Sequence, residues 1–323
     1  MGNSRANLQT SVPLSNLSIK IANQSENFKA SLLFPKKSVA KGTGKIRVYS
    51  GDNLIQEAVP LGRRSAAQEI ERKYATMSYT TEAFALRELI SDRDKRDADD
   101  DIADIELDSV QDQTERLLLG LEAAALAKAF TTTNFASGFE GALGGGSEWS
   151  NANGTPIDNI KLAQRTVLLG LGGLPADSMA LSMATYDILC AHPDIVDRVK
   201  YVMGQTAVVN ETALAAIFGL KVHVLATVEN TAQPSVAGTV TKAFMVSDKC
   251  LVYRSAGADG LRSSAFGKML VPTGGELSVV RYMPENQKGA WIETALEYAL
   301  QFTAVDSASS GKAIGGYLIS NCD

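Results

Sequence analysis

One long amphipathic segment constrains the fold of this 323-residue chain more than any other feature. Apolar side chains recur at three- and four-residue steps from Leu107 to Phe130, and carboxylates gather just before them in the stretch 99–106. This spacing places the apolar side chains on one face of an α-helix, with acidic residues where the helix dipole favours negative charge. The sequence therefore predicts one helix running without a break from about residue 99 to a stop at Thr131–Asn134, well past the average length of about 11 residues.

Composition and cysteine usage are those of a soluble globular protein. Hydrophobic residues make up 45% of the chain and charged residues 21%, which is enough apolar material for a core. No apolar run approaches the roughly 20 residues that cross a bilayer, and the N-terminus lacks the apolar segment of a signal peptide. We therefore expect no membrane contact. Cys190, Cys250 and Cys322 are too few and too far apart for a disulfide framework or a set of metal ligands.

Charge is divided unevenly along the chain. Residues 1–49 hold eight basic residues and one acidic residue, a net charge of +7, so the remainder carries −12 of the total of −5. Such a basic arm can bind nucleic acid, or it can lie across the acidic surface of a neighbouring copy. Few aromatic residues interleave with its cations, as stacking on single-stranded nucleic acid would require, and this favours the neighbouring copy. A solvated, disordered tail is the third alternative.

A two-stranded ribbon is predicted after the arm. Residues 45–49, 54–59 and 73–80 alternate or extend like strands, and a polar segment from 62 to 72 separates the last two. Two strands alone are barely stable in water, so the ribbon must rest on another surface, for which a partner subunit is a natural candidate. Four charged side chains lie at its predicted tip: Arg63, Arg64, Glu69 and Glu71.

Shorter elements follow the long helix. The glycine-rich stretch 138–146 lacks the Lys and Ser/Thr of a phosphate-binding loop, so we interpret it as a flexible loop. Beyond it, local patterns predict a mixed α/β region from about 155 to 275, inserted between two parts of another domain. The expected helices are 158–171, 184–189 and 214–220, the expected strands are 179–183, 221–225, 242–246, 250–253, 277–282 and 316–320, and a long ordered run covers 290–306.

Motifs for catalysis or metal binding are mostly missing. His223 lies on an alternating strand and is expected to be a satisfied or half-exposed strand residue, while His192 before Pro193 is expected to cap a helix end. The chain contains no nucleophile elbow, dinucleotide-binding turn or paired Cys-x-x-Cys motif. The carboxylates from Asp92 to Asp108 lack the central glycine and terminal glutamate of a calcium-binding loop. We therefore predict no catalytic, cofactor-binding or metal-binding residues.

In their order and spacing, three regions resemble the major capsid proteins of tailed bacteriophages, which have the Hong Kong 97-like fold. They are residues 74–93 with the Asp-rich lead into the long helix, then Trp149 with 156–160 and 183–201, and finally 214–222. The resemblance implies an α+β fold with an N-terminal arm (1–43) and an extended β-ribbon loop over the adjacent subunit (44–86). It also implies a peripheral domain with a long spine helix (87–154 and 276–323) and an inserted α/β axial domain (155–275).

The same resemblance implies a structural function. The chain would self-assemble, as pentamers and hexamers, into an icosahedral shell that forms around a scaffold in the host cytoplasm and then encloses double-stranded DNA in the virion. Scaffold and portal proteins, and in some shells decoration proteins, would be further partners, and the DNA would be held by weak, non-specific contacts. Some relatives join neighbours through a lysine–asparagine isopeptide bond, for which Lys45 or Lys73 would be the donor, although no asparagine is paired with either. The expected intersubunit contacts are Lys36, Lys37, Arg63, Arg64, Glu69 and Glu71.

Two other functions are compatible with the same sequence features. Encapsulin nanocompartments share the fold and enclose cargo enzymes, so copurified DNA or a copurified cargo protein would distinguish the two kinds of shell. A soluble α/β enzyme or binding protein is the alternative from a different class, and it would behave as a monomer or small oligomer in size-exclusion chromatography.

Overall fold

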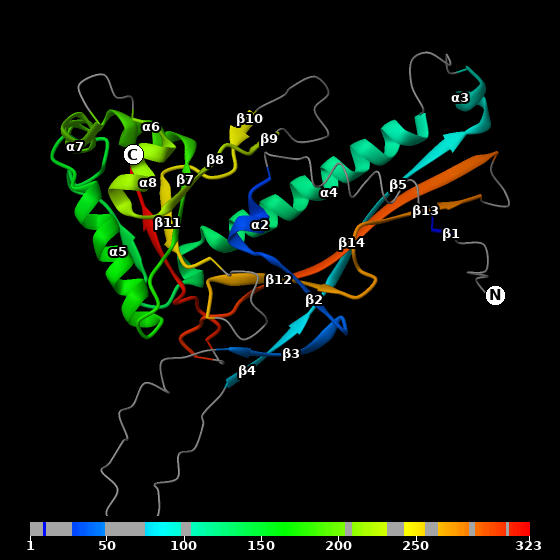
Figure 1. Cartoon of the computed structure of the whole chain (residues 1–323). Helices are drawn as coiled ribbons and strands as arrows, with labels where there is room; N and C mark the ends of the chain where they lie inside the picture. Colours follow the sequence, from blue (N-terminus) through cyan, green and yellow to red (C-terminus); the bar gives the residue numbers. More distant parts are fainter. Residues whose placement is uncertain are drawn as a thin grey trace, which may run out of the picture.

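Two β-sheets and one long helix between them form the core of the computed structural model (Figure 1). The structure describes residues 9–10, 28–48, 75–97, 105–203, 209–230, 242–255, 264–283, 288–307 and 310–323. A five-stranded sheet with helices α5 to α8 lies at one end of the molecule. The long helix runs from this end beside a six-stranded sheet toward the other end. The mixed α+β class predicted from the sequence is confirmed.

The long helix, α4, covers Ile105–Ala129 and is 25 residues long. Glu106 and Asp108 lie in its first turn, where negative charge complements the helix dipole. The predicted start at 99–104 lies outside the described residues, and a separate short helix, α3 (Asp92–Asp97), precedes that segment. The buried side chains follow the predicted three- and four-residue steps: Val110, Thr114, Leu117, Leu121 and Ala125. Leu107, the predicted first residue of this stripe, is exposed, so the buried face begins one turn later.

Side chains from two directions close the C-terminal end of α4. Thr131 and Asn134 donate from the following turn to carbonyls of the last helical turn, at 2.6 and 2.9 Å. Lys249 Nζ donates to the carbonyl of Phe130 at 2.9 Å. The last carbonyls of a helix have no partner within the helix, so these bonds satisfy groups that would otherwise need water. The predicted stop at Thr131–Asn134 is confirmed, with a short 3-10 turn at Thr132–Asn134.

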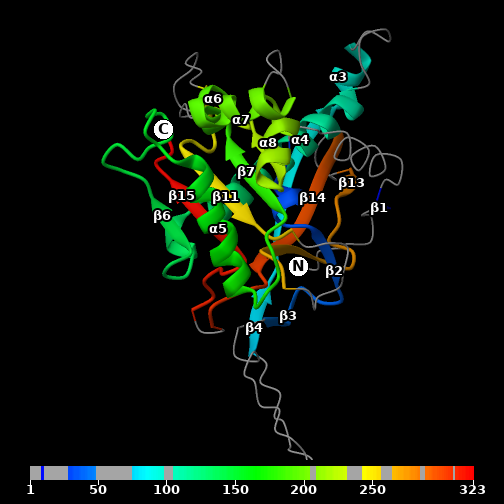
Figure 2. The ribbon, with the colours of Figure 1, turned by 60° about the vertical axis from the view of Figure 1, so that its left-hand side comes forward.

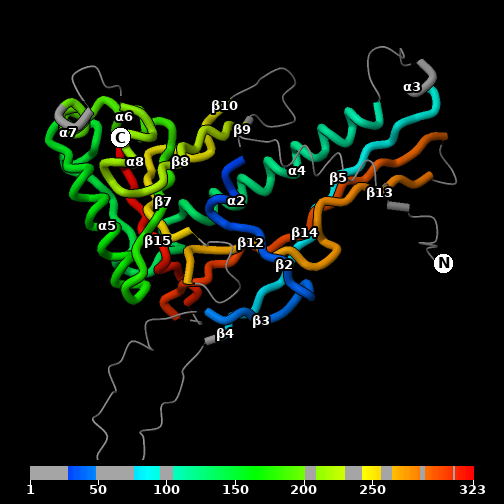
Figure 3. Tube along the Cα trace, in the orientation of Figure 1, coloured from blue at the N-terminus to red at the C-terminus, as the bar shows by residue number. Residues whose placement is uncertain are grey.

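The six-stranded sheet is built around one very long strand, β14 (Gly289–Phe302). Strands β13 and β12 pair with successive halves of one side of β14, and β5 pairs along the other side. Helix α4 packs on β14 and β5, as the trace in Figure 3 also shows. The expected ordered run at 290–306 is therefore mostly a single strand. The other strands are β1 (Gln9–Thr10), β2 (Lys36–Val39), β5 (Glu82–Ser91), β12 (Gly267–Pro272) and β13 (Ser278–Tyr282).

The five-stranded sheet has the order β6-β15-β11-β7-β8. Its buried side chains alternate between two cores: Met179 and Leu181 lie with the helices α5 to α8, and Ala180 lies with the end of α4. The predicted strands at 221–225 and 316–320 are found at the same residues. The strands are β6 (Glu140–Ala142), β7 (Ser178–Ser182), β8 (Lys221–Leu225), β11 (Lys249–Tyr253) and β15 (Gly316–Ser320).

The helices on this sheet, shown in Figure 2, begin and end at capping residues that the sequence supplies. Pro156 opens α5, Ser182 accepts the N–H of Thr185 at 3.3 Å to cap α6, and Asn210 accepts an N–H at 2.9 Å to cap α8. Gly219 ends α8 in the left-handed conformation, with φ of 67°. The bounds are α5 (Pro156–Gly170), α6 (Met183–Ala191), α7 (Pro193–Met203) and α8 (Glu211–Phe218).

Sheet membership does not follow the order of the strands in the sequence. Strand β12, expected in the inserted domain, belongs to the long sheet, and β15, expected in the outer domain, lies inside the five-stranded sheet. In addition, β5 runs through the expected boundary at Leu86. Each strand pairs with a partner far away in the sequence, so local pattern indicates that it is a strand without indicating its sheet.

The glycine-rich stretch 138–146 is not wholly a loop, which corrects the interpretation from sequence. Residues Glu140–Ala142 form β6, an edge strand parallel to β15. A Cβ on Gly141 would come within 2.7 Å of Tyr317 Oη, so glycine makes room for the neighbouring aromatic ring. The small side chains that suggested a loop instead allow a close approach to the sheet.

The base of the predicted ribbon is confirmed as an antiparallel pair of strands, β3 (Thr43–Val48) and β4 (Ala75–Thr80). The rest of the ribbon, residues 49–74 with the expected strand at 54–59, lies outside the described residues. A second two-stranded hairpin joins β9 (Val228–Asn230) to β10 (Lys242–Phe244). No helix in the described part of the chain combines the length and the apolar character needed to cross a membrane.

Candidate intersubunit surfaces

The ribbon is fixed to the long sheet at Thr81, the residue between β4 and β5. Its main-chain N–H donates to Gly42 O at 2.8 Å, and its hydroxyl lies within hydrogen-bonding distance of both Gly42 O and the Glu297 carboxylate. Tyr79 Oη donates to Lys41 O at 3.0 Å next to this joint. A Cβ on Gly42 would lie 2.8 Å from the Thr81 hydroxyl, so the joint needs glycine there. These contacts hold the base of the ribbon against the long sheet.

The two faces of the ribbon base differ in character. Ile46, Val48 and Tyr79 point inward and are buried in the main core. The alternate residues Lys45 and Arg47 lie on the outer face and are exposed. The base is therefore anchored by apolar packing on one side and presents cations on the other.

The structure describes only part of the predicted set of contact residues. Lys36 and Lys37 lie on β2, an edge strand of the long sheet. Lys36 Nζ forms an ion pair with Glu276 Oε1 at 2.7 Å, and the two side chains remain 47% and 56% exposed. An exposed pair of this kind contributes little stability, so the ammonium group stays accessible to a neighbour. The tip residues Arg63, Arg64, Glu69 and Glu71 lie outside the described residues.

Helix α4 covers one face of the long sheet. Val110 packs there in a buried cluster with Ile90, Val279 and Ile292. The side-chain amide of Gln113 forms bonds to the main chain of β14 at 3.1 and 3.3 Å. The fully buried Gln113 therefore ties the helix to the strand through both ends of its amide.

The other face of this sheet carries a cluster that the sequence analysis missed. The guanidinium carbon of Arg87 lies 4.6 Å from the ring centre of Trp291, and its Nη1 donates to Tyr282 Oη at 3.2 Å. Tyr282 Oη in turn lies 3.3 Å from Glu293 Oε2. Trp, Tyr and Arg are the residues that most often dominate protein interfaces. The four residues come from three strands, β5, β13 and β14. Trp291 and Glu293 are two residues apart on β14 and so lie on the same face of the sheet, which was the signal that the sequence offered.

A buried carboxylate joins three distant segments. Glu122 of α4 accepts the main-chain N–H groups of Lys29 and Ala30 at 3.1 and 2.6 Å, and the Thr227 hydroxyl lies 3.4 Å away. Burial raises the pKa of this carboxyl, and the two N–H donors partly offset the rise. A segment within the basic arm, the long helix and the connection after β8 therefore meet at one residue.

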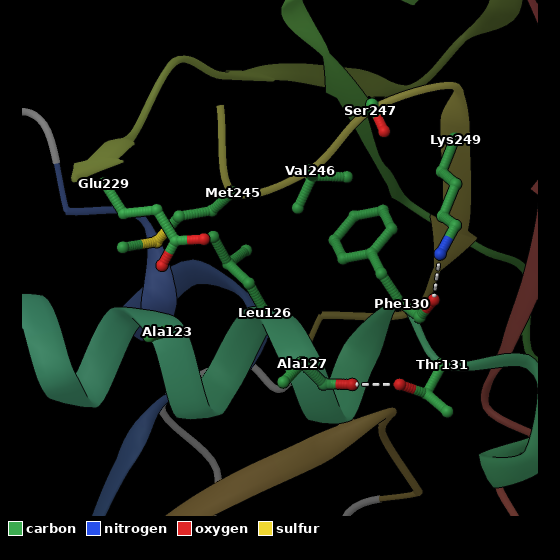
Figure 4. Close-up of a pocket in the computed structure, with 10 residues that line it drawn as sticks. All are labelled: Ala123, Leu126, Ala127, Phe130, Thr131, Glu229, Met245, Val246, Ser247 and Lys249. Carbon is green, nitrogen blue, oxygen red and sulfur yellow. Dashed lines mark hydrogen bonds between the residues drawn. The ribbon is translucent and has the colours of Figure 1, made fainter. Parts of the chain in front are cut away.

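A groove opens between the second half of α4 and the β9–β10 hairpin (Figure 4). Its volume is about 330 Å³. Leu126 and Phe130 rise into it from the helix, Met245 and Val246 lie opposite, and Glu229 stands at one rim. Polar groups contribute about as much of the lining as apolar ones, since Thr131, Ser247 and Lys249 also line the groove.

Histidine and cysteine take structural positions. His192 ends α6, and its Nδ1 accepts the main-chain N–H of Asp194 at 3.3 Å, which confirms the predicted role at a helix end. His223 is half-buried on the edge strand β8, and burial lowers its pKa. All three cysteines are free, and burial raises the pKa of the Cys250 thiol. Within the described ranges, no group of three or more His, Cys, Asp or Glu side chains is placed to hold a metal ion.

The fold matches solved structures of a phage-related protein, a phage capsid and an encapsulin. A phage-related protein from Bordetella bronchiseptica aligns over 98% of each chain with a TM-score of 0.72 and 17% identity. The capsid of Cyanophage P-SCSP1u aligns over 89% of this chain and 86% of that chain (TM-score 0.56, 11% identity). An encapsulin from Synechococcus elongatus aligns over 93% of this chain and 88% of that chain (TM-score 0.52, 13% identity).

These likenesses define the class of fold: the chain has the α+β fold that phage capsid proteins and encapsulins share. The sequence matches no protein-family model and no curated protein.

Proposed function

We propose that this chain is the major capsid protein of a tailed bacteriophage, which assembles into an icosahedral shell around double-stranded DNA. The observation that carries the proposal is the alignment, along nearly the whole of both chains, with a phage-related protein, together with the likeness to a cyanophage capsid. The anchored base of the ribbon and the Arg87–Trp291 face, where Arg87 is exposed among the described residues, support it, since a second copy would bury both.

The domain roles follow from this proposal. The long helix and long sheet would form a peripheral domain of Hong Kong 97-like type, and the five-stranded sheet with its helices would form the axial domain at the symmetry axes. We therefore assign β12 to the peripheral domain and β15 to the axial domain, because hydrogen-bonded strands of one sheet belong to one domain. The acidic body, with −12 outside residues 1–49, would touch packaged DNA only weakly. Scaffold, portal and decoration proteins are further proposed partners.

An encapsulin-type shell is the second candidate, because an encapsulin aligns with this chain nearly as well as the cyanophage capsid does. Both candidates predict closed particles, and they differ in contents. Electron microscopy of the purified protein tests the shared prediction, and particles are expected. Nuclease-protected DNA inside particles from infected cells supports a phage capsid. A stoichiometric cargo enzyme supports the encapsulin, and a discrete monomer with no particles would contradict both.

A further inference from the structure

The outer face of α5 carries exposed leucines. None of the described residues covers them. Leu162 is 50% exposed and Leu169 is 74% exposed. Their seven-residue spacing places them on one side of the helix, opposite the buried Ile160 and Val167. Arg165 lies between them on the same side and is exposed. We call Leu162, Arg165 and Leu169 the α5 stripe.

The groove beside α4 has the complementary character. Apolar exposure continues from it onto the β9–β10 hairpin, where Val228 and Phe244 are paired across the strands and remain 40% and 49% exposed. Glu229 stands at its rim. A two-stranded hairpin is marginally stable by itself, and a partner that covers Phe244 would also stabilise it. The groove thus has an apolar floor with the Glu229 carboxylate at one end and Lys249, which is bonded to Phe130 O, at the other. The α5 stripe is a convex apolar surface that includes a guanidinium.

The two surfaces lie on opposite sides of the five-stranded sheet. Helix α5 belongs to the core that contains Met179 and Leu181, whereas Leu126 of α4 belongs to the core that contains Ala180. Figure 1 shows the same arrangement, with α5 on the outer side of the sheet and the hairpin above α4. The stripe therefore has no access to the groove of its own chain.

We propose that the α5 stripe of one copy docks in the groove between α4 and the β9–β10 hairpin of the next copy, with Arg165 facing Glu229. This inference rests on the proposed shell function, because it assigns a partner to two surfaces of the same chain. Contact between two different surfaces is head-to-tail, and repetition of such a contact closes a ring when the rotation between copies permits it. The apolar area supplies attraction, and the charge pair fixes the orientation.

Cysteine pairing tests the geometry directly. The test variant has cysteine in place of Leu169 and Phe244 (Leu169→Cys, Phe244→Cys). Cys190 is replaced by serine (Cys190→Ser) because it is partly exposed, whereas Cys250 and Cys322 are buried and can stay. Under mild oxidation we expect a ladder of disulfide-linked multimers that ends at a closed ring, because every copy contributes both halves of the contact. Each single variant stays monomeric on a denaturing gel. The matched control is Leu169→Cys with Met283→Cys, whose second position follows β13 and is more exposed than Phe244, and it gives no ladder.

The alternative occupants are separate outcomes of this experiment. Dimers from Leu169→Cys alone would mean that two stripes meet each other, which overturns the proposal. Particles that form without any ladder from the double variant would overturn it as well, while the proposed shell function stands. Failure of the unmodified chain to form particles would instead remove the shell function and, with it, this inference.

Charge reversal provides a second test. Arg165→Glu and Glu229→Arg are each expected to lower the particle yield, and the double reversal is expected to restore it. The melting temperature of the unassembled protein is expected to change little in all three, because Arg165 is exposed and Glu229 is only partly buried. Equal losses in the single and double variants would overturn the pairing.

Discussion

The carboxylate of Glu122 accepts the main-chain N–H of Ala30 at 2.6 Å, and the Glu122 side chain is fully buried. The contact links the middle of the long helix to a segment within the basic arm, 92 residues earlier in the chain. A buried carboxylate is tolerated there because its oxygens receive hydrogen bonds from the main chain and from Thr227.

Replacing Glu122 with glutamine tests this junction. In glutamine one carboxylate oxygen becomes an NH2 group, which donates hydrogen bonds and cannot accept them. The main-chain N–H of Lys29 or Ala30 would then face this NH2 group and lose its acceptor. We expect Glu122→Gln to destabilise the fold by about 1–3 kcal/mol, measured by chemical denaturation. Glu115→Gln, on an exposed part of the same helix, is the control and should change stability by less than about 0.5 kcal/mol. An equal loss in both variants would mean that the effect comes from charge alone.

Two glycines of the chain should respond in opposite directions to alanine. A Cβ on Gly267 would lie 2.4 Å from the buried Phe34 ring, so Gly267→Ala should cost about 1–3 kcal/mol through overpacking. Gly120 lies on the exposed side of α4 with no atom within 4 Å of an added Cβ, so Gly120→Ala should stabilise by about 0.5–1 kcal/mol. Thermal unfolding of both variants checks this contrast, and a stabilised Gly267→Ala would contradict the described packing.

Acid–base behaviour near Asp323 gives a pH prediction. Burial first, and then the neighbouring Asp248 carboxyl, raise the pKa of Asp323 from 3.8 to about 6. The folded state therefore binds this proton more tightly than the unfolded chain, and stability should fall as pH rises from about 4 to about 6. Asp248→Asn should make this fall smaller and raise stability at neutral pH. Denaturation curves between pH 4 and 8 measure the effect, with Asp306→Asn as the control.

Asp248 also has a left-handed backbone, with φ of 53°, a conformation that asparagine tolerates well. The backbone contribution does not depend on pH, so it appears as a constant offset in the same curves. A variant whose stability falls with pH as steeply as the unmodified chain would contradict the role of the carboxyl pair.

The Arg87–Trp291 contact should be measurable by a double-mutant cycle. Arg87→Ala and Trp291→Ala should each destabilise the protein, and the double variant by less than their sum, with a coupling of about 0.5–1 kcal/mol. The cycle uses urea denaturation of the unassembled chain. Additive losses would mean that the guanidinium and the ring do not interact.

The ribbon tip is tested by charge reversal at Arg63 and Arg64. If these side chains clamp an adjacent copy, reversing both should lower assembly yield and the melting temperature of the particles. The monomer should unfold as before. Unchanged yield and unchanged particle melting would argue against the clamp. Lys36→Glu, at the exposed ion pair on β2, extends the same measurement to the other predicted contacts.

Local elements could be predicted from sequence because their signals are local. The stripe of α4 from Val110 to Ala125 follows from helical spacing, and the strand 316–320 follows from a short apolar run. The stop after α4 was also predictable, since Thr131 and Asn134 lie next to the carbonyls that they satisfy.

The candidate intersubunit surfaces were harder to predict from the sequence. Lys36 and Lys37 could be singled out by charge, but the Glu276 partner of Lys36 is 240 residues away. The groove combines side chains of α4 with Glu229 and Met245, which no spacing rule relates. The α5 leucines are visible in the sequence, yet their exposure depends on which helix face the sheet covers.

The sequence by itself determined where helices and strands form, because backbone propensity, capping and apolar period act within a few residues. Tertiary structure alone decided which sheet β12 and β15 join, which groups meet Glu122, and which apolar side chains are exposed among the described residues. The physical reason is that strand pairing and burial depend on partners far apart in the chain, whose selection is a property of the whole packed fold.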